Sequence, residues 1–419
     1  MGFRAFCGAI LLVMKLPLNR KALCFVMLGW MTALPMAAAD DLATHYRAAL
    51  ERAPDVVAAE LDLKASEARL AAARRWVRGE LRLGVSAMTD AFKEDVGFSE
   101  QEFEFGASLW LPGERRAAKT AATSGIAEAQ AELELARLRV AARVRDAFWD
   151  VVLAGRLLDV ERDLVRRAGA SRDAVQRLVA AGEAAPTDGE LAEAELAERQ
   201  QAVLLASAQL ARATAALSVE SGLTVVSGVS EALRDDTAIA VERDNHPQIR
   251  ATRNRQQRLA AEADRARRAF GASPELGFII RRERLQQQLP YEEVAGLRLS
   301  IPLGRNPDAR SDAFERAAAA RRADREAERA RDRLDEELVV ARLAQQQSRQ
   351  VAELADRRSS ALARIVNGVE RSHVEGETSY LNLLLTRTAW LEARRQQVEA
   401  EVGALRAHSL RLQVEGQLP

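Results

Sequence analysis

The spacing of the prolines constrains this chain more than any other feature of its sequence. No proline occurs between Pro112 and Pro186, or between Pro307 and the terminal Pro419. Because proline breaks the interior of a helix, such intervals allow helices far longer than the usual three turns. The composition agrees, since aromatic residues make up only 5% and charged residues 29% of the 419 positions. At 1.5 Å per residue, a helix from 113 to about 181 would be on the order of 100 Å long.

The charge balance excludes one class of partner. The chain has 61 Lys plus Arg and 61 Asp plus Glu, which gives a formal net charge of zero and excludes a strongly basic nucleic-acid binder. Arginine-rich runs at 253–268 and 321–333 are interspersed with acids, which is typical of solvated helix faces. We therefore expect no nucleic-acid partner.

The sequence carries no recognisable catalytic motif. It has no HExxH, no Walker-type glycine loop and no G-x-S-x-G, and its four histidines are isolated from other ligands. We therefore expect no enzymatic activity, no catalytic residue, no cofactor and no metal site.

Residues 1–39 have the features of a secretory signal peptide. Arg20 and Lys21 precede a 15-residue apolar stretch, and three alanines ending at Ala39 follow it. The stretch is shorter than the roughly 20 residues that a bilayer-spanning helix needs, and small residues at its exit are typical of a cleavage site. We expect export with cleavage after Ala39, and translation begins at either Met1 or Met14.

Export would leave a chain without cysteine, because Cys7 and Cys24 both lie in the signal. Neither a disulfide framework nor a thiol nucleophile is then available. No later run approaches 18 apolar residues, so the sequence excludes a helical bundle of the inner membrane.

The remaining chain repeats itself once, with matching landmarks about 190 residues apart. Pro54 corresponds to Pro247, and the pair Gly182-Glu183 corresponds to Gly376-Glu377. We interpret residues 40–222 as a first repeat, 223–244 as a connecting segment and 245–419 as a second repeat.

Within each repeat the hydrophobic period changes from helix to strand and back. Apolar residues over 41–77 recur every three or four positions, which predicts a helix. The period then becomes two, as where Phe103, Phe105 and Ala107 alternate with Glu102 and Glu104. We predict a β-hairpin over about 80–111 in the first repeat and over about 275–303 in the second.

A long helical segment follows each β-hairpin, turns at the Gly-Glu pair and returns. This pattern predicts two antiparallel coiled-coil hairpins, over about 113–221 and about 308–416. The predicted fold class is therefore mainly α with a small β part, in which long coiled-coil hairpins are duplicated and each chain contributes four strands.

Four strands cannot close by themselves. Strands with one apolar face, in an exported chain, suggest a membrane barrel, because only a closed barrel satisfies strand backbones in lipid. Three copies would supply about 12 strands and two copies about eight, the lower limit. The alternative, an ordinary periplasmic sheet packed on helices, would give such long helices no globular core to cover.

The duplicated repeats, each with a β-hairpin and a Gly-Glu helical turn, resemble the TolC-type outer membrane factor (outer membrane efflux protein) family over essentially the whole exported chain. The resemblance implies a homotrimer with one 12-stranded barrel in outer-membrane lipid and a periplasmic helical tunnel. It also implies a passive exit duct for small molecules or metal cations, docked to a periplasmic adaptor and an inner-membrane efflux transporter. A periplasmic coiled-coil adaptor or scaffold without a channel is the alternative, although an adaptor is expected to carry one hairpin flanked by β-rich domains.

The resemblance further implies that the adaptor is contacted at the helical turns. The expected contact residues occupy matching positions in the two repeats: Arg177, Gly182, Glu183 and Leu191 in the first, and Arg371, Gly376, Glu377 and Leu385 in the second. The structural alternative is that each glycine simply makes the turn while the charged residues cap helix ends.

A constriction is expected at the same tip. Six residues after the turn glycine the family often carries a carboxylate, which Asp188 supplies in the first repeat, whereas the second repeat has Asn382. His373 lies three residues before Gly376, where the family commonly has an aromatic residue. We hypothesise that His373 and Asp188 approach each other across neighbouring hairpins and make closure depend on pH; a solvated histidine is the alternative.

Overall fold

The structure is a computed structural model that describes residues 42–92, 96–223, 243–268, 273–303 and 307–419. Asp40–Pro419 forms one compact unit. The predicted signal peptide and nearly all of the predicted connecting segment lie outside the described residues.

Two helices begin the described chain, α1 (Leu42–Arg52) and α2 (Pro54–Arg74). The prediction of one helix over 41–77 was therefore wrong at two points. Pro54 has no amide hydrogen and disfavours helical geometry in the residue before it, so Ala53 is extended and the helix breaks there. At the other end Arg75 has already left the helix, with ψ at 154°.

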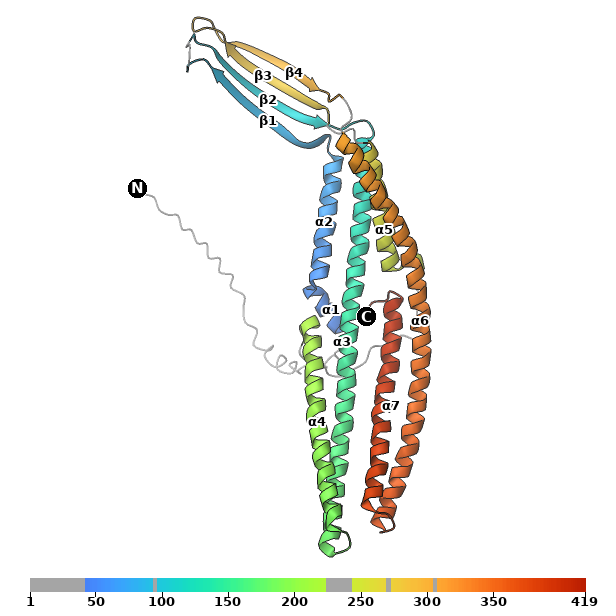
Figure 1. The fold of residues 1–419 in the computed structure, drawn as a ribbon. Coiled ribbons are helices and arrows are strands. Elements are labelled where there is room, and N and C mark those ends of the chain that lie inside the picture. Colours follow the sequence, from blue (N-terminus) through green and yellow to red (C-terminus); the bar gives the residue numbers. More distant parts are fainter. Residues whose placement is uncertain (1–41, 93–95, 224–242, 269–272, 304–306) are drawn as a thin grey trace, which may run out of the picture. The chain divides into compact units, whose positions relative to one another are not determined.

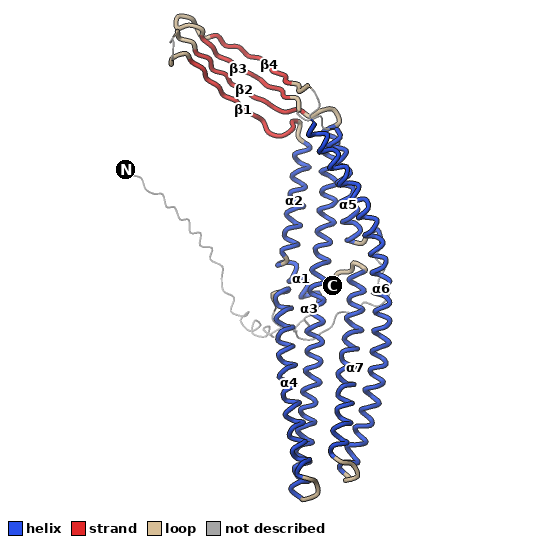
Figure 2. Tube along the Cα trace, in the orientation of Figure 1, coloured by secondary structure: helices blue, strands red, loops and turns tan. Residues whose placement is uncertain are grey.

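The four strands are β1 (Val77–Thr89), β2 (Ser99–Leu109), β3 (Glu275–Arg284) and β4 (Glu292–Ser300). They form one antiparallel sheet in the order β1-β2-β3-β4, so the β-hairpins of the two repeats join through β2 and β3 (Figures 1 and 2). β1 begins earlier than the predicted residue 80. Gly79, with φ at 78°, accompanies a register shift that interrupts the alternation from which the strand was predicted.

The two faces of the sheet differ sharply in composition. On one face Leu83, Phe105, Phe278 and Leu297 lie opposite one another across all four strands, and all of them are exposed. The other face carries cross-strand ion pairs: Arg82 with Glu275 at 2.9 Å, Arg281 with Glu102 at 2.7 Å, and Arg298 with Glu104 at 3.0 Å. The sheet therefore has one apolar and one charged face, and within the described chain neither is covered by a core.

Two long helical hairpins complete the fold. α3 (Glu114–Ala181) turns into α4 (Pro186–Ser221), and α6 (Pro307–Val374) turns into α7 (Tyr380–Val414). α3 and α6 each contain 68 residues, which corresponds to roughly 100 Å of helix. The predicted fold class, with duplicated long hairpins and four strands, is confirmed.

The largest core cluster surrounds the middle of α3. Val140, Val144 and Phe148 of α3 are fully buried there, together with Leu42 of α1 and Leu217 of α4. A short 3₁₀ turn (Arg243–Asn245) and α5 (Pro247–Arg268) lie between the two hairpins in sequence, and α5 packs against both α3 and α6. α3 is thus the helix around which the two repeats are assembled.

Among the described residues one helix, α4, is long and apolar enough to cross a membrane by length and composition. Ser207, Gln209 and Arg212 interrupt its apolar stretch, so the expectation that no later run approaches 18 apolar residues is not contradicted. α4 packs along α3 as the return arm of a hairpin, little of its apolar stretch is buried, and Leu204 and Leu205 are exposed. The composition of α4 therefore indicates an unpartnered helix face more than a membrane span.

Candidate functional site at the tips of the helical hairpins

The turn between α3 and α4 is a Schellman motif. Gly182 adopts a left-handed conformation, with φ at 78°, and its amide donates to the carbonyl of Val179 at 3.0 Å. The amide of Glu183 donates to the carbonyl of Leu178 at 2.9 Å. Glycine is favoured here because a side chain strains this backbone conformation.

The turn between α6 and α7 repeats this geometry bond for bond. Gly376 has φ at 79°, its amide donates to the carbonyl of His373 at 3.1 Å, and the amide of Glu377 donates to the carbonyl of Ser372 at 2.8 Å. The repeat that the Gly-Glu pairs indicate in the sequence therefore extends to the hydrogen bonds of the two turns.

The returning helices begin differently. α4 starts with Pro186 at its first position, after an extended Ala185 without a side-chain cap. α7 starts after Ser379, whose hydroxyl accepts a hydrogen bond from the amide of Asn382 at 3.4 Å. Tyr380 therefore occupies the position that Pro186 has in the first repeat, and an aromatic side chain is introduced at only one of the two tips.

The residues predicted to contact a partner lie on the surface of these tips. The four charged residues of the set, Arg177, Glu183, Arg371 and Glu377, are exposed. Leu385 is 62% and Leu191 36% exposed, and the space around the turn glycines is open. The structure thus leaves all eight positions accessible; their role as contacts stays a prediction.

The predicted constriction residues are not joined within one chain. Nδ1 of His373 lies 2.9 Å from the carbonyl oxygen of Thr378, and its ring centroid lies 5.6 Å from that of Tyr380. Among the described residues no hydrogen bond or ion pair links His373 to Asp188, which is half-buried at the start of α4. A contact between these two residues would have to be made across neighbouring copies.

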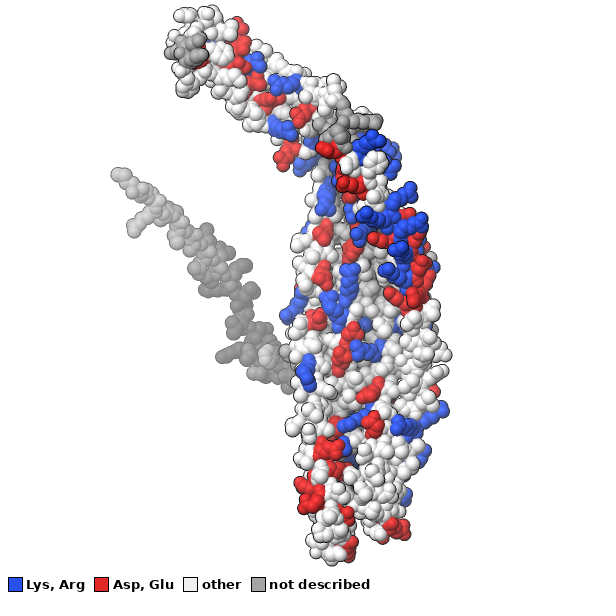
Figure 3. Space-filling view, in the orientation of Figure 1, with Lys and Arg blue, Asp and Glu red and all other residues white. Residues whose placement is uncertain are grey.

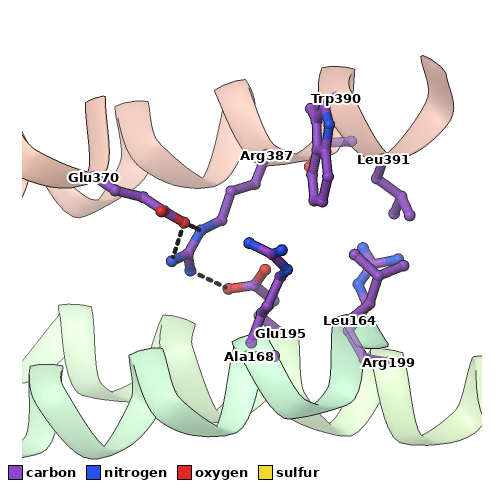
Figure 4. A pocket seen from close by; sticks show the side chains of 10 residues that line it. Leu164, Ala168, Glu195, Arg199, Glu370, Arg387, Trp390 and Leu391 are labelled. Carbon is purple, nitrogen blue, oxygen red and sulfur yellow. Dashed lines mark hydrogen bonds and ion pairs between the residues drawn. The ribbon is translucent and has the colours of Figure 1, made fainter. Parts of the chain in front are cut away.

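A buried polar network, which sequence reasoning missed, joins the two hairpins just above their tips. The hydroxyl of Tyr380 donates to a carboxylate oxygen of Glu195 in α4 at 2.8 Å. The guanidinium of Arg387 lies 3.7 Å from the same oxygen of Glu195 and donates to Glu370 at 2.9 Å (Figure 4). Glu195 is only 8% exposed, so its charge is held by Tyr380 and Arg387.

Apolar contacts surround this network on both sides. Towards the turn, Tyr380 and Leu383 pack against Val175 and Ala192 of the first hairpin. Away from it, the guanidinium of Arg167 lies 5.2 Å from the ring centroid of Trp390, which is near Leu391 in Figure 4. The two hairpins of one chain are therefore bonded to each other close to their free ends.

The environment of Tyr380 changes its acidity. Burial and the neighbouring carboxylate of Glu195 raise the pKa of the Tyr380 phenol to about 12. The phenol therefore stays a hydrogen-bond donor to Glu195 at every physiological pH. The sequence contained one signal for this site: Tyr380 is the position at which the second repeat departs from the proline of the first.

The tips contain no set of groups suited to metal coordination. In the part of the chain that the structure describes, no group of three or more His, Cys, Asp or Glu side chains could hold a metal ion. What the site offers is an exposed pair of turns with the same hydrogen-bond geometry, next to a buried polar network that joins the two hairpins.

Comparison with known proteins agrees with this architecture. Residues 45–222 match the family model described as outer membrane efflux protein. That match bears out the resemblance to this family over the first repeat. No curated protein sequence matches the chain.

Solved structures extend the fold match over most of the chain. The outer membrane protein VceC from Vibrio cholerae has 16% identity and a TM-score of 0.73, covering 90% of this chain and 96% of its own. The CmeC outer membrane channel of Campylobacter jejuni has 15% identity and a TM-score of 0.74, covering 90% and 85%. CusC, whose structures concern folding and transmembrane channel formation, has 15% identity and a TM-score of 0.76, covering 91% and 93%. At such low identities the comparisons establish the fold.

Proposed function

We propose that this chain is one subunit of a homotrimeric channel through the outer membrane, which conducts small molecules or metal cations passively out of the periplasm. Its predicted signal peptide would direct it there. The observation that carries the proposal is the four-stranded sheet, because its apolar face and its edges are both left unsatisfied in a single chain.

The apolar face of the sheet fits a lipid environment. The strands contain 9 to 13 residues, which is close to the roughly 9–11 that a tilted membrane strand needs. The row from Leu83 to Leu297 is exposed along its whole width. In water such a surface would favour aggregation, whereas in a bilayer it contacts acyl chains.

The edges of the sheet call for further copies of the chain. β1 and β4 each pair with only one neighbour in the sheet, so each leaves a row of backbone groups open. Because the sheet has four alternating antiparallel strands, β1 and β4 run in opposite directions, and β4 of one copy can pair antiparallel with β1 of the next. Three copies would close about 12 strands without an edge.

The charged face suits the interior of such a barrel. Glu102, Glu104, Arg281 and Arg298 pair across β2, β3 and β4, and charges of this kind are stable facing water but not facing hydrocarbon. The sheet therefore has the polar-in, apolar-out order that a water-filled pore requires.

The helices also present faces that a single chain does not cover. Leu204 and Leu205 of α4, and Val340 and Leu343 of α6, are exposed apolar residues far from the sheet in sequence. Packed against neighbouring copies, such faces would build the wall of a periplasmic tunnel.

The hairpin tips are the part of the tunnel wall that a partner protein of a pump could bind. We propose that a periplasmic adaptor contacts the exposed residues around Gly182 and Gly376, and that an inner-membrane efflux transporter delivers the cargo through this assembly. Support comes from the matching geometry of the two turns and from their accessibility. In this proposal the repeats are residues 40–222 and 245–419, with 223–244 connecting them.

The proposed constriction can be tested separately. If His373 and Asp188 meet across copies, protonation of His373 alters closure, and the conductance of the purified protein changes between about pH 5 and 8. The His373→Gln protein serves as the control. Identical pH responses of the two proteins would end this part of the proposal.

Channel function itself is tested by reconstituting the purified full chain in planar bilayers. We expect stepwise conductance and, in detergent, a mass of three copies. A water-soluble monomer without conductance would contradict the proposal and favour the adaptor or scaffold alternative. If conductance is observed, crosslinkers placed beside Gly182 and Gly376 in cells would identify the adaptor and the transporter. The transporter in turn would indicate the class of cargo.

A further inference from the structure

Exposed arginines surround the place where the helices meet the sheet. α2 ends just before β1, α3 begins just after β2, α5 ends just before β3 and α6 begins just after β4, so four helix ends adjoin the sheet (Figure 1). Figure 3 shows Lys and Arg side chains, with Asp and Glu among them, over this end of α5 and α6. We define the basic collar as six exposed arginines at these helix ends: Arg74, Arg75, Arg116, Arg265, Arg267 and Arg310.

The collar arginines are free to bind something outside the chain. Among the described residues no acidic side chain forms an ion pair with any of the six. Two of the nearby acids are engaged elsewhere: Glu114 is buried against Arg78 at 3.0 Å, and Asp264 pairs with Arg268 at 3.0 Å. Asp308, in the first turn of α6, offsets one positive charge. A clear excess of positive charge remains at this level of the molecule.

Helix stability does not explain the whole collar. Arg265 and Arg267 lie in the last turn of α5, where positive charge favours the helix dipole. Arg116 and Arg310, however, lie at the beginning of α3 and α6, where the dipole is positive and a further cation is unfavourable. The helix dipole therefore does not account for Arg116 and Arg310, although Glu114 and Asp308 lie in the same first turns.

Two exposed aromatic rings mark the same level. Trp76 is 86% exposed, and the guanidinium of Arg115 lies 5.7 Å from its ring centroid. Phe314 is 65% exposed, and the guanidinium of Arg310 lies 5.8 Å from its ring. Aromatic side chains with a polar neighbour are typical of the boundary between hydrocarbon and headgroups.

The apolar face of the sheet ends directly beside the collar. Val77 lies opposite Leu109 in the last paired row of β1 and β2, and Trp76 and Arg75 precede Val77 in the chain. In a membrane that holds the apolar face, residues just beyond this row reach the phosphate layer.

We infer that the basic collar binds the phosphate headgroups of anionic phospholipids in the periplasmic leaflet, with Trp76 and Phe314 at the hydrocarbon boundary. The inference rests on the proposed insertion of the sheet into the membrane. Each arginine near an anionic surface contributes roughly fivefold to binding, so three of them contribute on the order of 100-fold before screening by salt.

The test compares the full chain with two triple variants of equal charge change. The collar variant is Arg116→Gln, Arg267→Gln and Arg310→Gln. The control, Arg329→Gln, Arg357→Gln and Arg364→Gln, removes three exposed arginines of α6 that lie beyond its first turns. Each protein in detergent is titrated with phosphatidylglycerol and with phosphatidylcholine, and native mass spectrometry counts the retained lipids.

We expect the unchanged chain and the control to prefer phosphatidylglycerol, and the collar variant to lose at least about tenfold of that preference. Free glycerol phosphate should not displace the lipid, since headgroup and acyl chain bind together. Equal lipid preference in all three proteins, or full displacement by glycerol phosphate, would overturn the inference.

A separate assay distinguishes this failure from failure of the proposed function. All three proteins are mixed with vesicles of phosphatidylcholine alone and floated on a density gradient. Flotation without any preference for phosphatidylglycerol overturns only the collar. Absence of flotation for the unchanged chain overturns membrane insertion, and the collar inference with it.

Discussion

α3 and α6 are both 68 residues long and both descend from the sheet to a Schellman turn, yet their surroundings differ. α3 packs against α1, α2, α4, α5 and α7, and apolar residues at its middle, such as Val140, Val144 and Phe148, are fully buried. Among the described elements α6 packs mainly against α5 and α7, and it leaves Val340, Leu343 and Leu354 exposed. α3 and α6 have kept the same length and turn geometry, but the burial of their apolar residues differs. α3 forms the core of a single copy, whereas α6 leaves apolar residues on the surface of that copy.

The largest expected effect comes from truncating a buried side chain of α3. Phe148→Ala in α3 removes a side chain that is 0% exposed, and we expect it to lower the free energy of unfolding by about 3–5 kcal/mol. Val340→Ala in α6 should cost less than about 0.5 kcal/mol in a separated chain. Urea denaturation of both variants measures the contrast, and equal losses would contradict the difference in burial.

The network that joins the two hairpins should give the next largest effect. Arg387→Met leaves the carboxylates of Glu195 and Glu370 without their shared cation, which for buried pairs costs about 3 kcal/mol or more. We expect faster hydrogen exchange at the start of α7 and unchanged exchange around Phe148. Arg364→Met, an exposed change on α6, is the control. Unchanged exchange in α7 would show that the network does not hold the tips.

Changes on the exposed face of α6 should weaken assembly and leave the fold of one copy intact. Leu343→Glu removes an apolar contact worth about 1.5–3 kcal/mol if a neighbouring copy buries it, which lowers association at least tenfold. Glu337→Gln is a control on the same helix. Sedimentation in detergent measures the association, while circular dichroism reports the fold. Weakened association together with lost helicity would instead place Leu343 in the fold of the single copy.

The two turns should respond equally, because their geometry is the same. Gly182→Ala and Gly376→Ala each put a side chain on a left-handed residue with open space around it, at a cost of about 1 kcal/mol each. Thermal unfolding measures the loss of stability in each variant and so compares the two hairpins at their turns, where their geometry is most alike. A clear difference between them would mean that the environment of one turn contributes more than its backbone.

The smallest effect concerns the residue just before α5, at the beginning of the second repeat. Burial lowers the pKa of His246 below its usual value of about 6.5, and its Nδ1 accepts a hydrogen bond from the amide of Gln248 at 3.2 Å. As pH falls below about 6.5 the unfolded chain takes up the proton first, so folding stability decreases. We expect His246→Asn to lose less stability than the unchanged chain between about pH 7.5 and 5.5. If the stability of both proteins changed equally with pH, His246 would not be the cause of the decrease.

Local chemistry made much of this fold predictable from the sequence. The alternation through Phe103 and Phe105 and the long interval after Pro112 fix strand and helix without reference to the rest of the chain. The exceptions were also local, since Pro54 divides a helix and Gly79 shifts a register. The hydrogen bond between Tyr380 and Glu195 joins positions 185 residues apart. It depends on how the two hairpins pack together, which the hydrophobic periodicity of the sequence does not predict.

The central claim is that separate copies of the chain complete one sheet, and a short crosslink between its edges tests this most directly. Within one copy β1 and β4 are three strand spacings apart, or roughly 14 Å, so a crosslinker of about 6 Å cannot join them. With Cys7 and Cys24 replaced by serine, Val85→Cys on β1 and Leu297→Cys on β4 are introduced together into the membrane-bound protein. We predict crosslinked dimers and trimers from the double variant and none from either single variant. Only uncrosslinked monomer, from protein that is correctly folded and inserted, would contradict the account.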